Sequence, residues 1–294
     1  MERAVLPVLI GLWMGNAEAS SQESGMLQIW SVDPLVKVFR DAAPSQGTEA
    51  IAEVARGEHA TFQVVVRSDH AMTNLRASVG PLTLQDEPAP PLQPRPPRFV
   101  GYVPVDRPIQ LPPKDQLRKP PADFPDPLLE VESVSVPPRQ AQPIWITLPI
   151  PVAARPGHYR GQMEVSGDVG GRRTTGKFAL TARVYPAVVN RSRLWVTNWF
   201  AMHWPHMAIN PTPDSPEYWA LLRRYARNMA EHRQNVALIS PLGLASFTPR
   251  ADGQLDIDFA GFDRWVTIFM EEGVIGRIEG GHIGGRAGGW ISPF

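Results

Sequence analysis

Asn235-Val-Ala-Leu-Ile-Ser240 is a short apolar run between two segments with helical periodicity, at 216–233 and 259–272. Two further short runs complete the order strand, helix, strand, helix, strand: 194–199 and 276–280. Strands that alternate with helices are typical of parallel βαβ units. A whole (β/α)8 barrel takes roughly 250 residues. Residues 194–294 therefore predict only the first part of such a barrel, with about three strands.

The two helical segments carry recognisable ends. Ser215 followed by Pro216 is typical of a helix start, and Asp258 and Gly273 can begin and end the second helix. The second helix has apolar residues on one stripe: Phe262, Trp265, Val266, Phe269 and Met270. The first helix carries arginines that are typical of a solvated face: Arg223, Arg224, Arg227 and Arg233.

Residues 28–186 have the pattern of β-strands instead. β-Branched and alternating apolar residues recur in five short segments, divided by Gly and Pro turns: 59–67, 99–103, 144–148, 159–165 and 178–184. Such spacing predicts a β-sandwich. The proline-rich stretch 104–143 predicts a long rigid loop, and a linker is expected near 186–193. The predicted fold class is thus multidomain β plus α/β, an N-terminal β-sandwich followed by the first part of a truncated (β/α)8 TIM barrel.

Composition excludes several classes of function. The formal net charge of the 294 residues is +0, so no nucleic-acid partner is expected. The chain contains 0 cysteines, which excludes disulfides, thiolate metal sites and a cysteine nucleophile. Its 32 prolines are roughly twice the usual share of about 5% and concentrate in the N-terminal part.

Residues 1–19 have the features of an export signal peptide. A short N-terminal region with Arg3 precedes an apolar run, and Ala17-Glu-Ala19 has the form of a cleavage site. We expect an exported protein, periplasmic or extracellular, without a membrane anchor after cleavage. A buried N-terminal helix is the alternative interpretation.

Candidate site residues lie after the predicted strands, where barrels gather their functional groups. Aromatic rings can stack on the apolar faces of sugars, and Glu, His and Arg can bind hydroxyl groups. The candidate substrate-binding residues are Trp199, His203, Glu279, His282 and Arg286. Each has a structural alternative, since a tryptophan can fill a core and an arginine can close a loop through a carboxylate.

Other chemistries are poorly supported. Glu279 and His282 could form a pair of metal ligands, but a two-ligand site is incomplete. His203 and His206 could join them, yet no metal and no cofactor is predicted. The glycines after Glu279 lack the dinucleotide-binding order, and no serine-hydrolase elbow occurs. Glycoside hydrolysis generally needs two carboxyl groups. Glu279 is the only acidic residue well placed at a strand end, so no catalytic residue is assigned within this chain.

The chain resembles glycoside hydrolase family 123. In the N-terminal part the matching motifs are Lys37-Val-Phe-Arg40-Asp41, Ala55-Arg56-Gly57-Glu58-His59, Phe62-Gln63-Val-Val-Val-Arg67, Tyr102-Val-Pro-Val-Asp106, Pro125-Asp126-Pro127-Leu128-Leu129, Gln142-Pro143-Ile-Trp145 and Pro156-Gly157-His-Tyr159-Arg-Gly161. In the C-terminal part they are Thr197-Asn198-Trp199-Phe200, Met229-Ala230-Glu-His232-Arg233-Gln-Asn235 and Glu279-Gly280-Gly281-His282.

The resemblance implies an exported β-N-acetylgalactosaminidase with a substrate-assisted, retaining mechanism. An adjacent Asp-Glu pair after a later barrel strand would position the 2-acetamido group and protonate the leaving oxygen. No Asp-Glu pair follows Leu194, and the chain's one such pair, Asp86-Glu87, lies in the predicted sandwich. We therefore expect an N-terminal fragment that is inactive alone, whose partner is a glycan with a terminal 2-acetamido sugar.

Two alternatives stay open at this point. The chain could be a non-catalytic carbohydrate-binding or scaffolding protein in which the sandwich is the working part. It could also be a metal-dependent hydrolase built on the histidines and Glu279 named above.

Overall fold

The computed structural model describes residues 27–107, 116–189, 193–200, 202 and 209–281. The chain divides into two compact units, Met1–Val189 and Asn190–Phe294. The predicted signal peptide lies outside the described residues. The division at Val189 falls within the stretch where the sequence predicts a linker.

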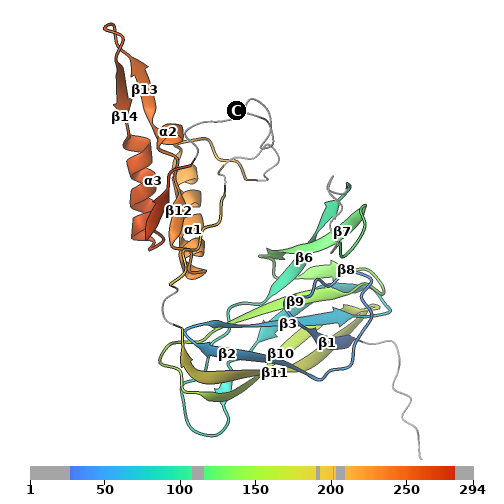
Figure 1. The fold of residues 1–294 in the computed structure, drawn as a ribbon. Helices are drawn as coiled ribbons and strands as arrows, with labels where there is room; N and C mark the ends of the chain where they lie inside the picture. Colours follow the sequence, from blue (N-terminus) through green and yellow to red (C-terminus); the bar gives the residue numbers. More distant parts are fainter. Residues whose placement is uncertain (1–26, 108–115, 190–192, 201, 203–208, 282–294) are drawn as a thin grey trace, which may run out of the picture. The chain divides into compact units, whose positions relative to one another are not determined.

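The first unit contains two large sheets (Figure 1). The five-stranded sheet has the order β1-β3-β9-β6-β7, and all its neighbours are antiparallel. Its strands are β1 (Gln28–Val32), β3 (His59–Arg67), β9 (Gln142–Pro149), β6 (Arg98–Val105) and β7 (Ala122–Leu129). The mostly-β prediction for this part of the chain is confirmed.

The six-stranded sheet has the order β2-β11-β10-β4-β8, with β5 also paired to β10. β2 and β11 are parallel, and the other pairs are antiparallel. Its strands are β2 (Glu49–Arg56), β11 (Arg172–Val188), β10 (Gly157–Val169), β4 (Met72–Val79), β8 (Val134–Val136) and β5 (Thr83–Leu84).

Both sheets contribute side chains to one hydrophobic core. Phe62 and Val64 of β3 lie in it together with Met163 of β10 and Leu180 of β11, each at most 2% exposed. The opposite face of β3 is buried as well, because Val65 packs with a second cluster that includes Trp30. Burial on both faces explains the three consecutive valines at 64–66 of β3, each of which is fully buried.

The prediction of a long loop at 104–143 is wrong, because this stretch contains β7 and β8. β7 includes Pro125 and Pro127, which belong to the proline-rich stretch that was predicted to be a rigid loop. β7 lies at the end of the sheet order, where proline is tolerated because no second neighbour needs its amide hydrogen.

The segment just after β1 contacts this edge strand. The Lys37 ammonium donates to the backbone oxygen of Pro125 and pairs with Asp126, both at 3.0 Å. Phe39 packs edge-on against Phe124, with ring centroids 5.4 Å apart. Two of the motifs that carry the family resemblance are therefore packed against each other.

The second unit is α/β. Its elements are α1 (Pro216–Glu231), β12 (Val236–Leu238), α2 (Pro241–Leu244), β13 (Ser246–Pro249), β14 (Leu255–Asp258), α3 (Ala260–Glu271) and β15 (Arg277–Glu279). β12 and β15 are parallel, with Val236 opposite Arg277 and Leu238 opposite Glu279. This pair, with α3 between its strands, is a βαβ unit as the sequence predicts. The complete (β/α)8 barrel stays a prediction.

Helices α1 and α3 both begin and end within two residues of the predicted positions. The Ser215 hydroxyl accepts a hydrogen bond from the Tyr218 amide and caps α1. The Asp258 carboxylate accepts one from the Ala260 amide at 2.9 Å, and Gly273 follows α3 with a φ of 85°. Of the predicted α3 stripe, Phe269 is fully buried, whereas Met270 is 62% exposed.

Two features of this unit differ from the elements predicted from the sequence. Residues 194–199 are not a β-strand, although they were predicted to be the first strand of the barrel. An antiparallel hairpin, β13–β14, lies between α2 and α3 and was not predicted (Figure 1). No helix in the described part of the chain has the length and hydrophobicity needed to span a bilayer.

Candidate functional site

The carboxylate of Glu279 lies at the carboxyl end of β15 and is held by two donors. The Trp199 indole Nε1 donates to Glu279 Oε2 at 3.1 Å, and the Thr197 hydroxyl donates to the same oxygen at 3.3 Å. Trp199 is 58% exposed, although its indole N–H is engaged. The structure thus brings together two of the predicted site residues, Trp199 and Glu279.

Side chains after α1 hold the segment that carries Trp199. Asn235 Oδ1 accepts from the Val196 amide at 2.8 Å, and Asn235 Nδ2 donates to the Leu194 carbonyl at 2.9 Å. The Val196 carbonyl accepts from the amides of Asn235 and Val236 at 3.2 and 3.1 Å. The side chain of Asn235 therefore makes hydrogen bonds that the backbone of a paired strand would otherwise make. For this reason 194–199 lies beside β12 without being a strand.

The buried side chain of Gln234 adds further hydrogen bonds between 194–198 and the start of β12. Gln234 is 3% exposed, and its side chain donates to the Val236 carbonyl at 2.9 Å and accepts from Asn198 Nδ2 at 3.2 Å. A buried amide with both its oxygen and its nitrogen hydrogen-bonded is held in one orientation. We refer to the contacts of Gln234 and Asn235 with 194–198 as the amide clasp.

The ends of β12 and β15 meet next to Glu279. A side chain added at Gly281 would lie 3.6 Å from Cβ of Ser240, and Gly281 has a φ of 75°. A Cβ added at Gly280 would lie 3.7 Å from Cδ of Pro241. The loops after the two parallel strands therefore lie side by side, as expected for the carboxyl edge of a barrel sheet.

This arrangement can bind a polar ligand but has one carboxylate. Both hydrogen bonds described above are accepted by Oε2 of Glu279, and no donor within the described ranges reaches Oε1. That oxygen can accept a hydrogen bond from a ligand hydroxyl. No group of three or more His, Asp or Glu side chains suited to a metal occurs among residues 27–281 where the structure describes them.

The other predicted site residues cannot be located here. His203, His206, His282 and Arg286 lie outside the described residues. Conversely, the sequence motifs contain Thr197, Gln234 and Asn235 but did not identify them as site residues. A polar pair that directly precedes an apolar strand was the sequence feature that could have identified the amide clasp.

Ion pairs fix the helices that support the site. Arg223 and Arg227 of α1 both bind the carboxylate of Glu272 at the end of α3, at 3.0 and 3.1 Å. The hydrogen bonds from Arg227 and Arg223 hold the pKa of Glu272 below its usual value. Two of the arginines predicted to be solvated therefore join α1 to α3.

Comparison with known families supports the family resemblance most directly in the N-terminal part of the chain. Residues 39–167 match the glycoside hydrolase 123 N-terminal domain family. This match confirms the resemblance to family 123 over the first unit. No curated protein matches the chain in sequence.

Among solved structures, the chain is similar to a family 123 glycoside hydrolase from Clostridium perfringens that is described in terms of glycolipid glycan hydrolysis. The TM-score is 0.65 at 12% identity, over 85% of this chain and 46% of that chain. At this identity the similarity shows a shared fold, and the chain spans about half of the Clostridium protein.

Two further similarities are too weak to carry an argument. A Porphyromonas gingivalis protein of unknown function has a TM-score of 0.27 at 8% identity, over 54% of this chain and 48% of that one. The CooA pilin subunit of enterotoxigenic Escherichia coli has a TM-score of 0.28 at 10% identity, over 55% of this chain and 99% of that one.

Proposed function

We propose that this chain, whose residues 39–167 match the glycoside hydrolase 123 N-terminal domain, is the N-terminal part of an exported glycoside hydrolase. The family match is the observation that carries the proposal. The shared fold over 85% of the chain with a family 123 enzyme supports it, as does the 46% share of that enzyme that the chain spans.

The proposed substrate is a glycan that ends in a β-linked N-acetylgalactosamine. The proposed reaction is substrate-assisted and retaining, so the acetamido carbonyl attacks its own anomeric carbon and the protein supplies an acid and an orienting carboxylate. A neighbouring group already held near the reacting carbon needs little further ordering, which is how such a reaction gains rate.

In this proposal the described residues bind the sugar and do not cleave the bond. The exposed part of the Trp199 side chain would contact the apolar face of a sugar ring. Oε1 of Glu279 would accept a hydrogen bond from one of its hydroxyl groups. The support for these roles is the hydrogen bond that holds the two side chains together at the end of β15.

The proposed Asp-Glu catalytic pair belongs to a part of the enzyme outside this sequence. The only Asp-Glu pair present, Asp86-Glu87, follows β5, and Glu87 forms an exposed ion pair with Arg155 at 2.9 Å. An exposed and already paired carboxylate is poorly suited to donate a proton to a leaving group.

Hydrolysis of an aryl β-N-acetylgalactosaminide tests the proposal. The chain alone should give no turnover above background, and a longer product of the same gene that contains the whole barrel should turn the substrate over. Turnover by the chain alone, or none by the longer product on any N-acetylhexosaminide, would contradict the proposal.

A matched pair of variants tests the role of Glu279 in the longer product. Glu279→Gln should raise KM because a neutral amide is a weaker acceptor for a sugar hydroxyl. Glu217→Gln, at an exposed position in the first turn of α1, should leave KM unchanged. Equal kinetics in both variants would remove Glu279 from the site.

Export is part of the same proposal and is tested separately. Protein recovered from the periplasm or the medium should begin at Ser20, directly after the Ala17-Glu-Ala19 sequence. Recovery with Met1 intact from the cytoplasm alone would contradict export and leave the enzymatic proposal unaffected.

A further inference from the structure

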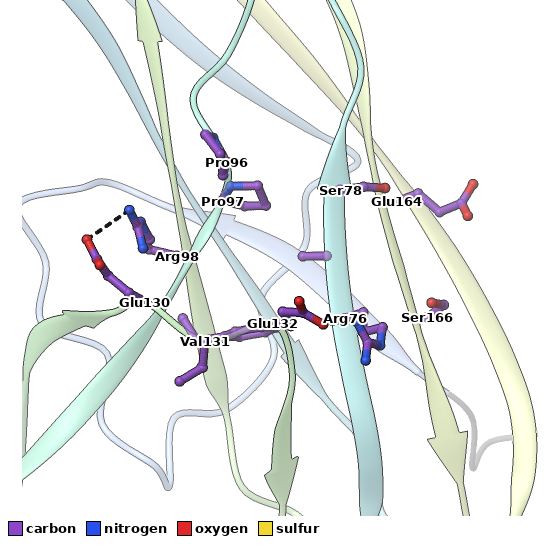
Figure 2. Close-up of a pocket in the computed structure, with 12 residues that line it drawn as sticks. Arg76, Ser78, Pro96, Pro97, Arg98, Glu130, Val131, Glu132, Glu164 and Ser166 are labelled. Carbon is purple, nitrogen blue, oxygen red and sulfur yellow. Dashed lines mark hydrogen bonds and ion pairs between the residues drawn. The ribbon is translucent and has the colours of Figure 1, made fainter.

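The first unit contains a hollow of about 520 Å³ that lies outside the site described above. Figure 2 shows its walls: Arg76 and Ser78 of β4 on one side, and Pro96, Pro97 and Arg98 at the start of β6 on the other. The volume is within the range of roughly 300–1,000 Å³ that is usual for small-molecule sites.

Strand lengths explain why a hollow forms here. β8 pairs with β4 only from Met72 to Leu75, and no strand among the described residues covers the rest of β4 on that side. β4 belongs to the six-stranded sheet, and β6 belongs to the five-stranded sheet. The hollow thus lies at an open side between the two sheets.

The short segment between β7 and β8 crosses this opening and is fixed at both walls. Glu130 binds Arg98 of the five-stranded sheet at 3.0 Å, and Glu132 binds Arg76 of the six-stranded sheet at 3.0 Å. Val131 lies between them and is 47% exposed (Figure 2). The two ion pairs thus link this segment to both walls, and two consecutive prolines restrict the backbone of one wall.

Its lining combines flat apolar surface with planar polar groups. Pro96, Pro97 and Val131 offer C–H surface, and the guanidinium of Arg76 and the carboxylate of Glu132 offer paired donors and acceptors. The side chains of this ion pair are 51% and 86% exposed, so a ligand can reach them. A sugar presents the same combination, with apolar ring faces and adjacent hydroxyl groups.

The charge balance favours an uncharged ligand. The two arginines are each paired with a glutamate of the crossing segment, and Glu164, the remaining carboxylate, has Lys177 at 3.9 Å. An anion or cation would meet a charge of its own sign next to every favourable one. A neutral ligand with hydroxyl groups can use both kinds of group.

We propose that this hollow binds a short neutral oligosaccharide. It would hold part of the glycan on the N-terminal unit, apart from the residues around Glu279. The choice of ligand class rests on the proposed glycan-directed function. The existence of the site rests on the geometry of β4, β6 and the segment between β7 and β8.

Titration of the full chain with neutral trisaccharides that end in β-linked N-acetylgalactosamine tests the inference. Amide chemical shifts of Ser78 and Val131 should move on binding, and Arg76→Ala should weaken binding roughly tenfold because a charge-assisted hydrogen bond is lost. Arg155→Ala is the matched control, since Arg155 forms a similarly exposed ion pair elsewhere in the same unit.

The outcomes separate this inference from the proposed function. Shifts confined to residues around Glu279, no binding of any neutral oligosaccharide, or equal weakening by Arg76→Ala and Arg155→Ala would each overturn the inference. Binding of an extended peptide along β4 in preference to the sugars would overturn it as well. None of these results would affect turnover by the longer gene product, which tests the proposed function by itself.

Discussion

Tyr102 shows how a single hydroxyl group connects three segments of the first unit. Its phenol lies 3.0 Å from the Val38 carbonyl and 3.2 Å from the Ala141 carbonyl, and it can donate its hydrogen to either. The guanidinium of Arg40 lies over its ring, 4.0 Å from the centroid. Burial raises the pKa of Tyr102 to about 12.

The raised pKa predicts a loss of stability at alkaline pH. The neutral phenol is favoured in the fold, so its contribution is complete below the ordinary tyrosine pKa of about 10 and is lost as pH rises toward 12. Urea unfolding at several pH values should show this decline, and Tyr102→Phe should flatten it and cost about 1 kcal/mol at neutral pH. Tyr225→Phe is the control, because Tyr225 lies in α1 of the second unit and takes no part in the contacts of Tyr102. An unchanged alkaline decline in Tyr102→Phe would contradict the prediction.

The ion pairs between α1 and α3 predict how the stability of the second unit changes at acid pH. Glu272 is 12% exposed and accepts hydrogen bonds from Arg227 and Arg223, which lower its pKa. A lowered pKa contributes stability above the ordinary glutamate value of about 4.3, and this contribution is lost as pH falls through the lower folded value.

Glu272→Gln should therefore destabilise the second unit at pH 7 and have a smaller effect near pH 3. Thermal unfolding of both proteins at the two pH values measures the difference. Glu217→Gln, in the first turn of the same α1, provides the comparison. A loss of stability in Glu272→Gln that is equally large at pH 3 and pH 7 would show that the ion pairs are not its cause.

The β13–β14 hairpin should tolerate substitution. Phe247 lies opposite Ile257 and Pro249 opposite Leu255, which places these apolar residues on one face of the hairpin. Phe247 and Ile257 are 42% and 48% exposed, so removing them uncovers little buried surface. Phe247→Ser should cost no more than about 1 kcal/mol in thermal or denaturant unfolding, the upper range for a cross-strand pair. A larger loss would mean that this face is covered in the folded protein.

Elements with local determinants could be predicted from the sequence. α1 and α3 were found because Ser215, Asp258 and Gly273 act at their ends through short-range hydrogen bonds and backbone geometry. The bounds of β3 were predicted correctly because 59–67 combines alternation with β-branched residues. The hairpin was overlooked although Asp252-Gly253 is a recognisable turn signal.

Elements that depend on distant neighbours could not be predicted. β7 contains prolines and is a strand because it lies at the edge of its sheet. Residues 194–199 have strand-like composition, yet Asn235 binds their backbone through its side chain. The contact between Trp199 and Glu279 joins residues 80 positions apart, and no local pattern contains it.

At the scale of the whole molecule, the two units have separate cores. Leu180 lies in the core of the first unit and Leu222 in that of the second, and both are fully buried. Among the described residues, no hydrophobic cluster includes members of both units. Each unit is therefore expected to unfold in its own transition.

Calorimetry of two core variants tests this separation. Leu180→Ala and Leu222→Ala should each cost about 2–5 kcal/mol, the usual range for a buried leucine. Each variant should lower the midpoint of one transition and leave the other in place. A single transition that both variants shift equally would show that the units unfold together.

The prolines of β7 have a consequence for the behaviour of the protein at high concentration. Pro125 and Pro127 lack amide hydrogens, and the Pro125 carbonyl already accepts a bond from Lys37. A strand from a neighbouring molecule would find too few backbone partners along β7 to extend the sheet. We therefore expect this edge to resist fibril growth, and Lys37→Ala together with Pro125→Val to weaken that resistance.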